Sequence, residues 1–342
     1  MAVVLVKSKI YIIAEAGVNH NGKLDLALQL VEEAAKAGAD AVKFQTFKAE
    51  KLVSIHAPKA EYQKKSGVQG ENQLEMLKKL ELGPAEHKAA MTRCRELGIE
   101  FLSTPFDPES MKMLRGLGIS TFKIGSGEIT NLPYLRAIAA YNMPTILSTG
   151  MSTLAEVKAS VKALTDAGLS PDKLTLLHCN TQYPTPDHDV NLKAMLTLSE
   201  HFPAIDGVGY SDHSEGLEAC FAAAALGATV LEKHFTLSRN LPGPDHQSSL
   251  EPDELRQLVA GVRRIEAMLG SGLKEPSESE RPNLIPARKS IVAARKISKG
   301  ELFSEENITP KRPGSGISPM RWDEVMGKPA KRDFEPDELI DI

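Results

Sequence analysis

The chain has 342 residues, of which 42% are hydrophobic, and a formal net charge of −4. This length allows one large core and a small second unit, and the balanced charge indicates binding neither to nucleic acid nor to an acidic membrane surface. Three cysteines without C-x-x-C spacing, Cys94, Cys179 and Cys220, are typical of a reducing compartment and not of a disulfide scaffold. The apolar N-terminus is interrupted by Lys7 and Lys9 and is too short for a membrane span, so we expect a cytoplasmic protein.

Short apolar runs alternate with amphipathic stretches over most of the chain. This alternation predicts parallel strands joined by crossover helices. Eight such runs favour a closed (β/α)8 barrel, a TIM barrel, over a doubly wound open sheet, because no G-x-G-x-x-G motif follows the first run. The expected strands are 10–16, 41–46, 100–104, 121–125, 145–149, 174–179, 205–211 and 229–235.

Helices are expected between these strands, for example 23–37 and 84–97, each followed by a glycine that ends it. The connection 48–83 is long for a barrel, so we expect it to carry a short helix at 73–80 and to form part of a pocket. After residue 270 the composition changes. We expect a catalytic barrel at 1–270, a linker at 271–286 and a small C-terminal domain at 287–342, whose limited core leans on another surface, such as that of a partner subunit.

Two histidines, His213 and His234, lie at the ends of the last two expected strands, with an Ala-rich helical stretch at 216–227 between them. Strands joined in this way are parallel neighbours, so both imidazoles should emerge at the same edge of the sheet. One histidine at a strand end is most often an ordinary hydrogen-bonded residue. Two at matched positions, each preceded by polar residues, favour a site for a divalent metal.

Polar side chains also close the other expected strands, where barrel enzymes carry out their chemistry. Lys43 and Lys123 lie in otherwise apolar runs, so each must pair with an anion or have a shifted pKa. A structural salt bridge is the common explanation for one buried lysine, and a Schiff base is an alternative role for Lys123. The two lysines together with the hydroxyls of Thr104, Ser126 and Ser148 favour a pocket for a small phosphorylated, carboxylated ligand.

Two carboxylates, Glu15 and Glu128, end the first and fourth expected strands. Each is a candidate for moving a proton or holding a substrate hydroxyl. A carboxylate that only pairs with Lys43 or Lys123 is the equally weighted alternative.

Long motifs spread along the chain resemble those of the sialic acid synthases, which join phosphoenolpyruvate to an N-acetylated mannose-type aldehyde sugar. The tail S-I-V-A-A-R-K-I-S-K-G-E-L with K-R-P-G-S-G-I is similar to the antifreeze-like (SAF) domain of these enzymes. The barrel motifs are I-A-E-A-G-V-N-H-N-G at 13–22, K-F-Q-T at 43–46, S-T-P-F-D at 103–107, F-K-I-G-S-G-E at 122–128, S-T-G-M at 148–151, Y-P-T-P at 183–186, S-D-H, E-K-H-F and P-G-P-D.

This resemblance implies a metal-dependent transferase and gives roles to residues of this chain. His213 and His234 match ligands of Mn²⁺, with Mg²⁺ or Co²⁺ as alternatives, and water and the substrate aldehyde complete the shell. Arg312 matches an arginine that reaches from the SAF domain into the partner's barrel of a domain-swapped homodimer and binds the N-acetyl group of the sugar. The phosphoenolpyruvate positions are Lys43, Thr104, Lys123, Ser126, Ser148, Asn180 or Thr181, and Ser211. The positions facing the sugar and the reacting centre are Glu15, Gln45, Glu128, Tyr183 and Asp245, and Lys43 joins Glu15 and Glu128 as catalytic residues.

The motif wording is more similar to the branch that uses 2,4-diacetamido-2,4,6-trideoxymannose and makes N,N′-diacetyllegionaminate. Synthesis of N-acetylneuraminate from N-acetylmannosamine is the alternative. A phosphoenolpyruvate aldol enzyme acting on a phosphorylated aldose would need a second phosphate site, and no further lysine–arginine cluster follows the expected strands. A sugar-binding or ice-binding protein without catalytic activity would not need two lysines and two histidines inside a barrel.

Overall fold

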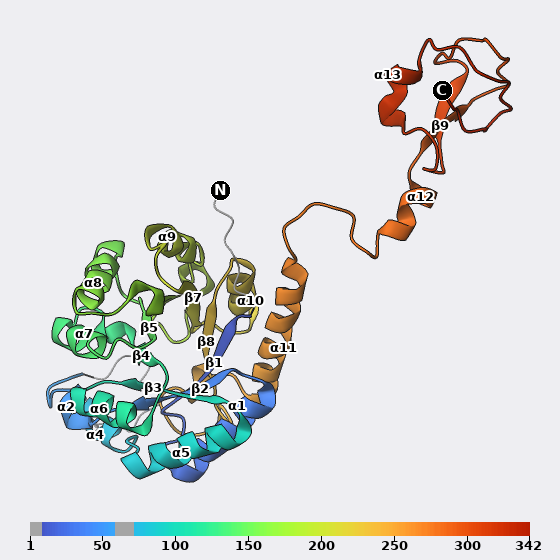
Figure 1. Ribbon diagram of the computed structural model, residues 1–342. Helices are drawn as coiled ribbons and strands as arrows, with labels where there is room; N and C mark the ends of the chain where they lie inside the picture. The colour runs from blue at the N-terminus through green and yellow to red at the C-terminus, as the bar shows by residue number, and fades with distance from the viewer. Residues whose placement is uncertain (1–8, 59–71) are drawn as a thin grey trace. The chain divides into compact units, whose positions relative to one another are not determined.

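The computed structural model describes residues 9–58 and 72–342. The chain divides into two compact units, Met1–Gly270 and Ser271–Ile342 (Figure 1). The N-terminal segment 1–8 and residues 59–71 of the expected long connection lie outside the described residues. In the described part of the chain, no helix is both long enough and apolar enough to cross a membrane.

The first unit is built on a ring of parallel strands. Neighbours pair in the order β3-β2-β1-β8-β7-β6-β5-β4, and β3 and β4 at the two ends of this order lie side by side. This arrangement confirms the predicted (β/α)8 barrel. The strands are β1 (Tyr11–Gly17), β2 (Ala41–Thr46), β3 (Glu100–Pro105), β4 (Phe122–Ile124), β5 (Thr145–Ser148), β6 (Leu174–Cys179), β7 (Gly207–Asp212) and β8 (Val230–His234).

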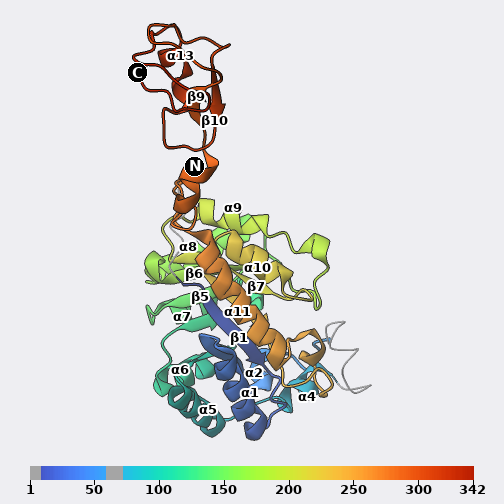
Figure 2. The ribbon, with the colours of Figure 1, turned by 90° about the vertical axis from the view of Figure 1, so that its right-hand side faces the viewer.

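Helices cover the outside of the ring. Figure 2 shows α11 along the barrel wall, where it packs against both α1 and α10. The expected glycine stops are present, since Gly38 and Gly98 follow α1 and α5 with φ of 81° and 71°, a left-handed conformation that glycine adopts without strain. The helices are α1 (Leu24–Ala37), α2 (Ala49–Leu52), α4 (Gln73–Lys78), α5 (Pro84–Leu97), α6 (Pro108–Leu117), α7 (Leu132–Ala139), α8 (Leu154–Asp166), α9 (Lys193–His201), α10 (Glu218–Ala225) and α11 (Pro252–Leu269).

Strand alternation divides the buried residues of the barrel into two sets. One side of each strand packs against the helices and forms the main core, which includes Leu231 of β8. The other side faces the barrel interior, where a small apolar layer closes the lower end. Its buried members are Ile13, Ala41, Leu102, Ile146, Leu177 and Val230. Glu232 follows Val230 by two residues and lies on the same face of β8. The polar side chains therefore begin directly above this apolar layer, which forms the floor of the barrel interior.

The second unit has a core of its own. Strands β9 (Ser290–Ala293) and β10 (Ile308–Lys311) pair antiparallel, and α13 (Trp322–Val325) contributes Val325 to the same apolar cluster. The residues expected as a linker include two short helical turns, η5 (Arg281–Asn283) and α12 (Leu284–Ala287). The proline and serine content of this segment therefore does not keep it fully extended.

Candidate active site

A small cavity of about 180 Å³ lies above the apolar floor, at the C-terminal ends of the barrel strands. Its walls come from the strands themselves and from the loops that follow them. Twelve of the residues singled out from the sequence line it: Glu15, Lys43, Gln45, Thr104, Lys123, Ser126, Ser148, Thr181, Tyr183, Ser211, His213 and His234. The fold thus brings together side chains that span more than 200 positions of sequence.

Lys43 is held from three sides. Its Nζ lies 2.7 Å from Glu15 Oε2 and 3.8 Å from Glu232 Oε1, and it donates a hydrogen bond to Thr104 Oγ1 at 3.3 Å. Burial alone would lower the pKa of Lys43, but the two carboxylates outweigh it and raise that pKa. The ammonium group therefore stays charged inside the barrel.

Lys123 lies near the same carboxylate oxygen of Glu232 as Lys43 does. Its Nζ is 3.4 Å from Glu232 Oε1 and donates a hydrogen bond to Ser148 Oγ at 2.7 Å. Here burial dominates and lowers the pKa of Lys123, because the attraction to Glu232 offsets the cost of burial only in part and Lys43 adds a smaller repulsion. The two lysines share Glu232, and together they form a lysine cradle in which an anionic ligand can be bound.

The two carboxylates of this cradle differ in protonation. Burial raises the pKa of Glu15 to about 7, although Lys43 opposes the shift. Burial also acts on Glu232, but Lys123 and Lys43 outweigh it and hold the pKa of Glu232 well below its usual value. Two acids with pKa values moved apart can perform different tasks at one pH: Glu15 can exchange a proton, and Glu232 stays ionised.

The two predicted metal-ligand residues converge. The ring centroids of His213 and His234 are 5.3 Å apart, and the Tyr183 ring lies 4.1 Å from the first and 5.5 Å from the second. His213 Nδ1 donates to the Asn180 carbonyl, which leaves its Nε2 free to act as a ligand. Burial lowers the pKa of His213 to about 4 and holds that of His234 well below its usual value, so both imidazoles are neutral, as metal binding requires.

The donor set fits a cation that takes two ligands from the protein. Nδ1 of His234 is buried and, within residues 9–58 and 72–342, has no hydrogen-bond partner. The same described ranges contain no group of three His, Cys, Asp or Glu side chains that could hold a metal ion. Among these residues, the two imidazoles therefore have no third side chain of these types beside them as a co-ligand.

A second polar group gathers around Gly17, which has a φ of 51°. A Cβ atom at this position would lie 3.2 Å from Glu15 Oε1, 3.4 Å from Gln45 Nε2 and 3.6 Å from Asp245 Oδ2. Burial raises the pKa of Asp245 to about 6, with Lys43 opposing. The absence of a side chain at Gly17 lets three predicted sugar-facing residues approach one another.

Four predicted residues do not line this cavity. Glu128 ends a 3-10 turn and accepts a hydrogen bond from Asn131 Nδ2 at 2.6 Å. Asn180 is engaged within its own loop, where its Oδ1 accepts from Gln182 N–H, and its carbonyl orients His213 while its neighbour Thr181 lines the wall. The other two are Asp245, which lies beside Gly17, and Arg312, which is exposed directly after β10 in the second unit.

Sequence reasoning missed Glu232, which contacts both lysines and accepts a hydrogen bond from Ser211 Oγ at 3.1 Å. Glu232 and Lys233 are the two polar residues that precede His234 in the sequence. The alternation of side chains along a strand could have identified Glu232. Residues two apart on a strand share a face, so Glu232 must point to the same side as His234, and Lys233 to the other side.

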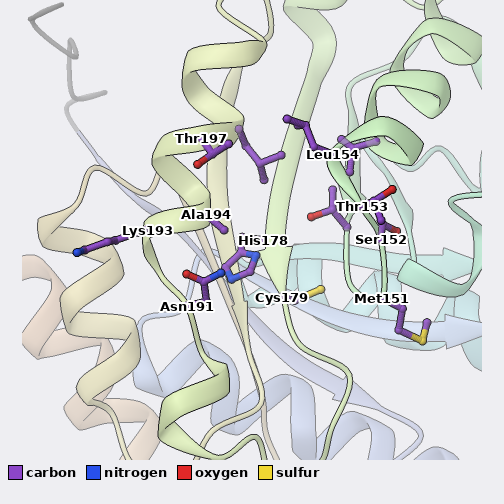
Figure 3. Close-up of a pocket in the computed structure, with 13 residues that line it drawn as sticks. Met151, Ser152, Thr153, Leu154, His178, Cys179, Asn191, Lys193, Ala194 and Thr197 are labelled. Carbon is purple, nitrogen blue, oxygen red and sulfur yellow. The ribbon is translucent and has the colours of Figure 1, made fainter.

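A larger cavity of about 610 Å³ adjoins the first one, between α8 and α9. Met151 and Cys179 border both cavities, whereas His178 lines only the larger one and has its Nε2 2.9 Å from the Val190 carbonyl oxygen. Figure 3 shows Cys179 and Met151 at one edge of the ring of labelled side chains. The wall between the two cavities is therefore one layer of side chains thick.

A model described as the NeuB family matches residues 30–274, and a model of the SAF domain matches residues 288–341. The chain belongs to the NeuB family. Among NeuB-family relatives, the N,N'-diacetyllegionaminic acid synthase of Campylobacter jejuni is 52% identical, over 97% of this chain and 99% of that protein. The enzyme of the same name from Legionella pneumophila is 48% identical, over 93% of this chain and 89% of that protein.

A solved structure with the NeuB-family fold gives the same result. The crystal structure of an N-acetylneuraminic acid synthetase from Leptospira borgpetersenii has a TM-score of 0.71 and 35% identity, and covers 83% of this chain and 94% of that one. The predicted family, the barrel followed by an SAF domain and the prediction of an enzyme are confirmed.

Proposed function

We propose that this chain is an N,N′-diacetyllegionaminate synthase, which condenses phosphoenolpyruvate with 2,4-diacetamido-2,4,6-trideoxymannose and releases phosphate. The observation that carries this proposal is the 52% identity, over nearly the whole of both chains, to an enzyme of that name. Synthesis of N-acetylneuraminate from N-acetylmannosamine is the second candidate, supported by the 35% identical N-acetylneuraminic acid synthetase with the same fold.

The lysine cradle suits phosphoenolpyruvate, which carries a phosphate and a carboxylate on one small carbon frame. Lys43 and Lys123 supply two ammonium groups within one cavity, and hydroxyls of Thr104 and Ser148 already bond to them. Binding would exchange contacts to Glu15 and Glu232 for contacts to the ligand's own anions. Two fixed anchor points orient the enol face toward the acceptor, which supplies the proximity part of catalysis.

We propose a divalent cation, most suitably Mn²⁺ with Mg²⁺ or Co²⁺ as alternatives, at His213 and His234. The neutral imidazoles, their 5.3 Å centroid separation and the unpartnered buried Nδ1 of His234 support this proposal for the described residues. When bound, such a cation polarises a carbonyl oxygen and makes its carbon electrophilic. The carbonyl in question is the aldehyde of the acceptor sugar.

The reaction itself joins C3 of phosphoenolpyruvate to the aldehyde carbon. Water then adds at C2, and phosphate leaves when the bond between C2 and its bridging oxygen breaks. The new hydroxyl gains a proton, and the added water loses both of its protons, one on addition and one as phosphate leaves and the ketone forms, so a nearby acid or base must exchange protons near neutral pH. Glu15, with its pKa raised to about 7, suits this task, and Glu128 remains the alternative.

We also propose the domain-swapped homodimer, in which Arg312 serves the partner's barrel, and a cytoplasmic location. Arg312 is exposed on a unit of limited size with its own core, which supports a role for this unit against another surface. Cys94, Cys179 and Cys220 are all free and buried, which supports a reducing compartment.

Phosphate release tests the proposed function directly. The full-length protein, phosphoenolpyruvate, Mn²⁺ and either sugar should release phosphate, with a higher kcat/KM for the diacetamido sugar than for N-acetylmannosamine. His213→Ala should abolish release, whereas His201→Ala, which changes an exposed histidine on α9, should not. A higher kcat/KM for N-acetylmannosamine would favour the second candidate, and no phosphate release with either sugar would exclude both.

A further inference from the structure

Behind the two histidines, on the helix-facing side of β7 and β8, lies an ion pair that the proposed chemistry does not use. Lys233 Nζ donates to Asp212 Oδ2 at 2.6 Å. Asp212 is 1% and Lys233 2% exposed, so both charges are removed from water. The attraction within an ion pair buried to this extent offsets the free-energy cost of desolvation only when every remaining donor and acceptor is hydrogen-bonded.

Both carboxylate oxygens of Asp212 accept hydrogen bonds. Its Oδ1 accepts hydrogen bonds from Tyr210 Oη at 3.1 Å, from Ser214 N–H at 2.9 Å and from Ser214 Oγ at 2.7 Å, and its Oδ2 also accepts from Cys220 Sγ of α10 at 3.3 Å. Lys233 Nζ donates a second hydrogen bond to the Ser214 carbonyl at 2.8 Å. This network joins β7, β8, the start of the loop after β7 and α10 at one carboxylate.

The network fixes the register of β7 against β8 directly before the two histidines. Asp212 and Lys233 are direct partners in the parallel pairing of β7 with β8, and the preceding partners are Ser211 and Glu232. Ser211 Oγ donates to Glu232 Oε1 at 3.1 Å on the inner face. Side-chain bonds on the two faces therefore hold the strands together one residue (Asp212 with Lys233) and two residues (Ser211 with Glu232) before the histidines.

We propose that Asp212 and Lys233 are positioning residues for the metal site: their ion pair fixes the separation of the His213 and His234 imidazoles. The inference rests on the proposed function in one respect, the binding of a cation by these two histidines. A site with only two protein ligands depends strongly on their spacing, because no third side chain corrects an error in it. The pair acts through the backbone, since neither residue faces the cavity.

The test measures Mn²⁺ affinity of the full-length protein, from the electron paramagnetic resonance signal of free Mn²⁺. Asp212→Asn/Lys233→Met removes the ion pair without leaving an unpaired buried charge. We expect the Kd for Mn²⁺ to rise about 10-fold or more, the range found when groups that support metal ligands are lost. The Kd for phosphoenolpyruvate, measured by calorimetry without metal, should not change, because the lysine cradle is left intact.

A matched control removes another ion pair from the same barrel. Asp40→Asn/Arg263→Met deletes a partly buried pair between the residue before β2 and helix α11, at the end of the barrel away from the histidines. It should lower the thermal stability but leave the Kd for Mn²⁺ unchanged. Equal loss of Mn²⁺ affinity in both double variants would show a general effect of stability and overturn the positioning role.

Two further outcomes separate this inference from the proposed function. Wild-type protein that binds no Mn²⁺ would remove the proposed metal site and the inference with it, whereas wild-type affinity in a folded Asp212→Asn/Lys233→Met variant would overturn the inference alone. Should that variant not fold, Tyr210→Phe deletes one hydroxyl donor to Asp212. Its Kd for Mn²⁺ should rise about threefold, as expected for the loss of one of several hydrogen bonds, and an unchanged Kd would overturn the inference.

Discussion

At the scale of single residues, Glu232 determines how two lysines share one small cavity. It lies between Lys43 and Lys123 and stays ionised because both ammonium groups act on it. Without Glu232, the repulsion between the lysines would have only Glu15 to offset it, and Glu15 has a raised pKa. A dianionic or trianionic ligand would provide the same compensation for the two ammonium groups.

The first prediction concerns Lys123. Lys123→Met should raise the KM for phosphoenolpyruvate about 10- to 100-fold, because one charge-assisted hydrogen bond to the ligand is lost. Steady-state phosphate release measures it. Lys162→Met, which removes an exposed lysine paired with Asp166 on α8, is the matched control and should leave KM as it is. Unchanged KM in Lys123→Met would exclude this lysine from ligand binding.

The second prediction concerns Glu15. Glu15→Gln should lower kcat about 10²- to 10⁴-fold, the usual contribution of a group that transfers a proton. The wild-type pH profile of kcat should have a limb near pH 7, where Glu15 titrates, and the variant should lack it. Activity that falls above pH 7 would identify the protonated form as the active one, and activity that falls below it the ionised form.

Glu128→Gln, measured alongside, completes this comparison. Glu128 accepts a hydrogen bond from Asn131 and does not line the small cavity, so its variant should retain the limb near pH 7. Full turnover in Glu15→Gln together with a lost limb in Glu128→Gln would assign the proton transfer to Glu128.

At the scale of elements, most of the barrel was predictable because each strand is an apolar run that ends in polar residues. The bounds of β2 and β6 agree with the prediction residue for residue. β7 begins two residues later than expected, at Gly207, because the Ile205 N–H donates to the Phe202 carbonyl in a turn and not to a neighbouring strand. Apolar residues in turns and in strands look alike in a sequence.

The positions of site residues on strands were predictable from the strand periodicity. The positions of site residues in loops were not, because they depend on loop geometry. His213 and His234 end adjacent strands, so their meeting follows from the fold. Which of Asn180 and Thr181 lines the cavity depends on the turn after β6. In this turn Asn180 Oδ1 accepts a hydrogen bond from Gln182 N–H, and Thr181 lines the cavity. No periodicity encodes such a turn.

The third prediction concerns the elements that follow β1 and β8, where His20 and His246 are buried. Burial lowers the pKa of His20 to about 3 and that of His246 to about 4. A histidine whose pKa falls on folding does not lower the unfolding free energy at pH values above its unfolded pKa of about 6.5. Below that pH the histidine takes up a proton in the unfolded state but not in the folded state, so the unfolding free energy falls. At pH 5 the loss for His20 is about 2 kcal/mol of unfolding free energy.

Thermal unfolding as a function of pH measures this effect. The Tm of the wild-type protein should fall between about pH 7 and pH 5, and the fall should be shallower in His20→Gln, which cannot be protonated. His201→Gln, at an exposed position, should show the wild-type slope. A His20→Gln slope equal to that of the wild-type protein would contradict the prediction.

At the scale of the whole molecule, the fourth prediction tests the domain-swapped homodimer. His213→Ala lacks one of the two proposed metal ligands in its barrel, and Arg312→Ala lacks the arginine that is proposed to serve the partner's barrel. Each variant alone should be inactive or weakly active. After mixed refolding, about a quarter of the wild-type activity should return, because half of the dimers are mixed and one of their two sites combines an intact barrel with an intact SAF domain. No recovery would place Arg312 in the service of its own barrel.

The alternation along β7 and β8 also restricts how such a barrel can change its length. One residue inserted directly after Val230 would turn Lys233 into the cavity and Glu232 and His234 toward the helices, so inward and outward side chains would exchange faces. Insertions in loops beyond the strand ends cause no such inversion. The loops can therefore vary in length, while the strands that carry the site residues keep a constant count of residues.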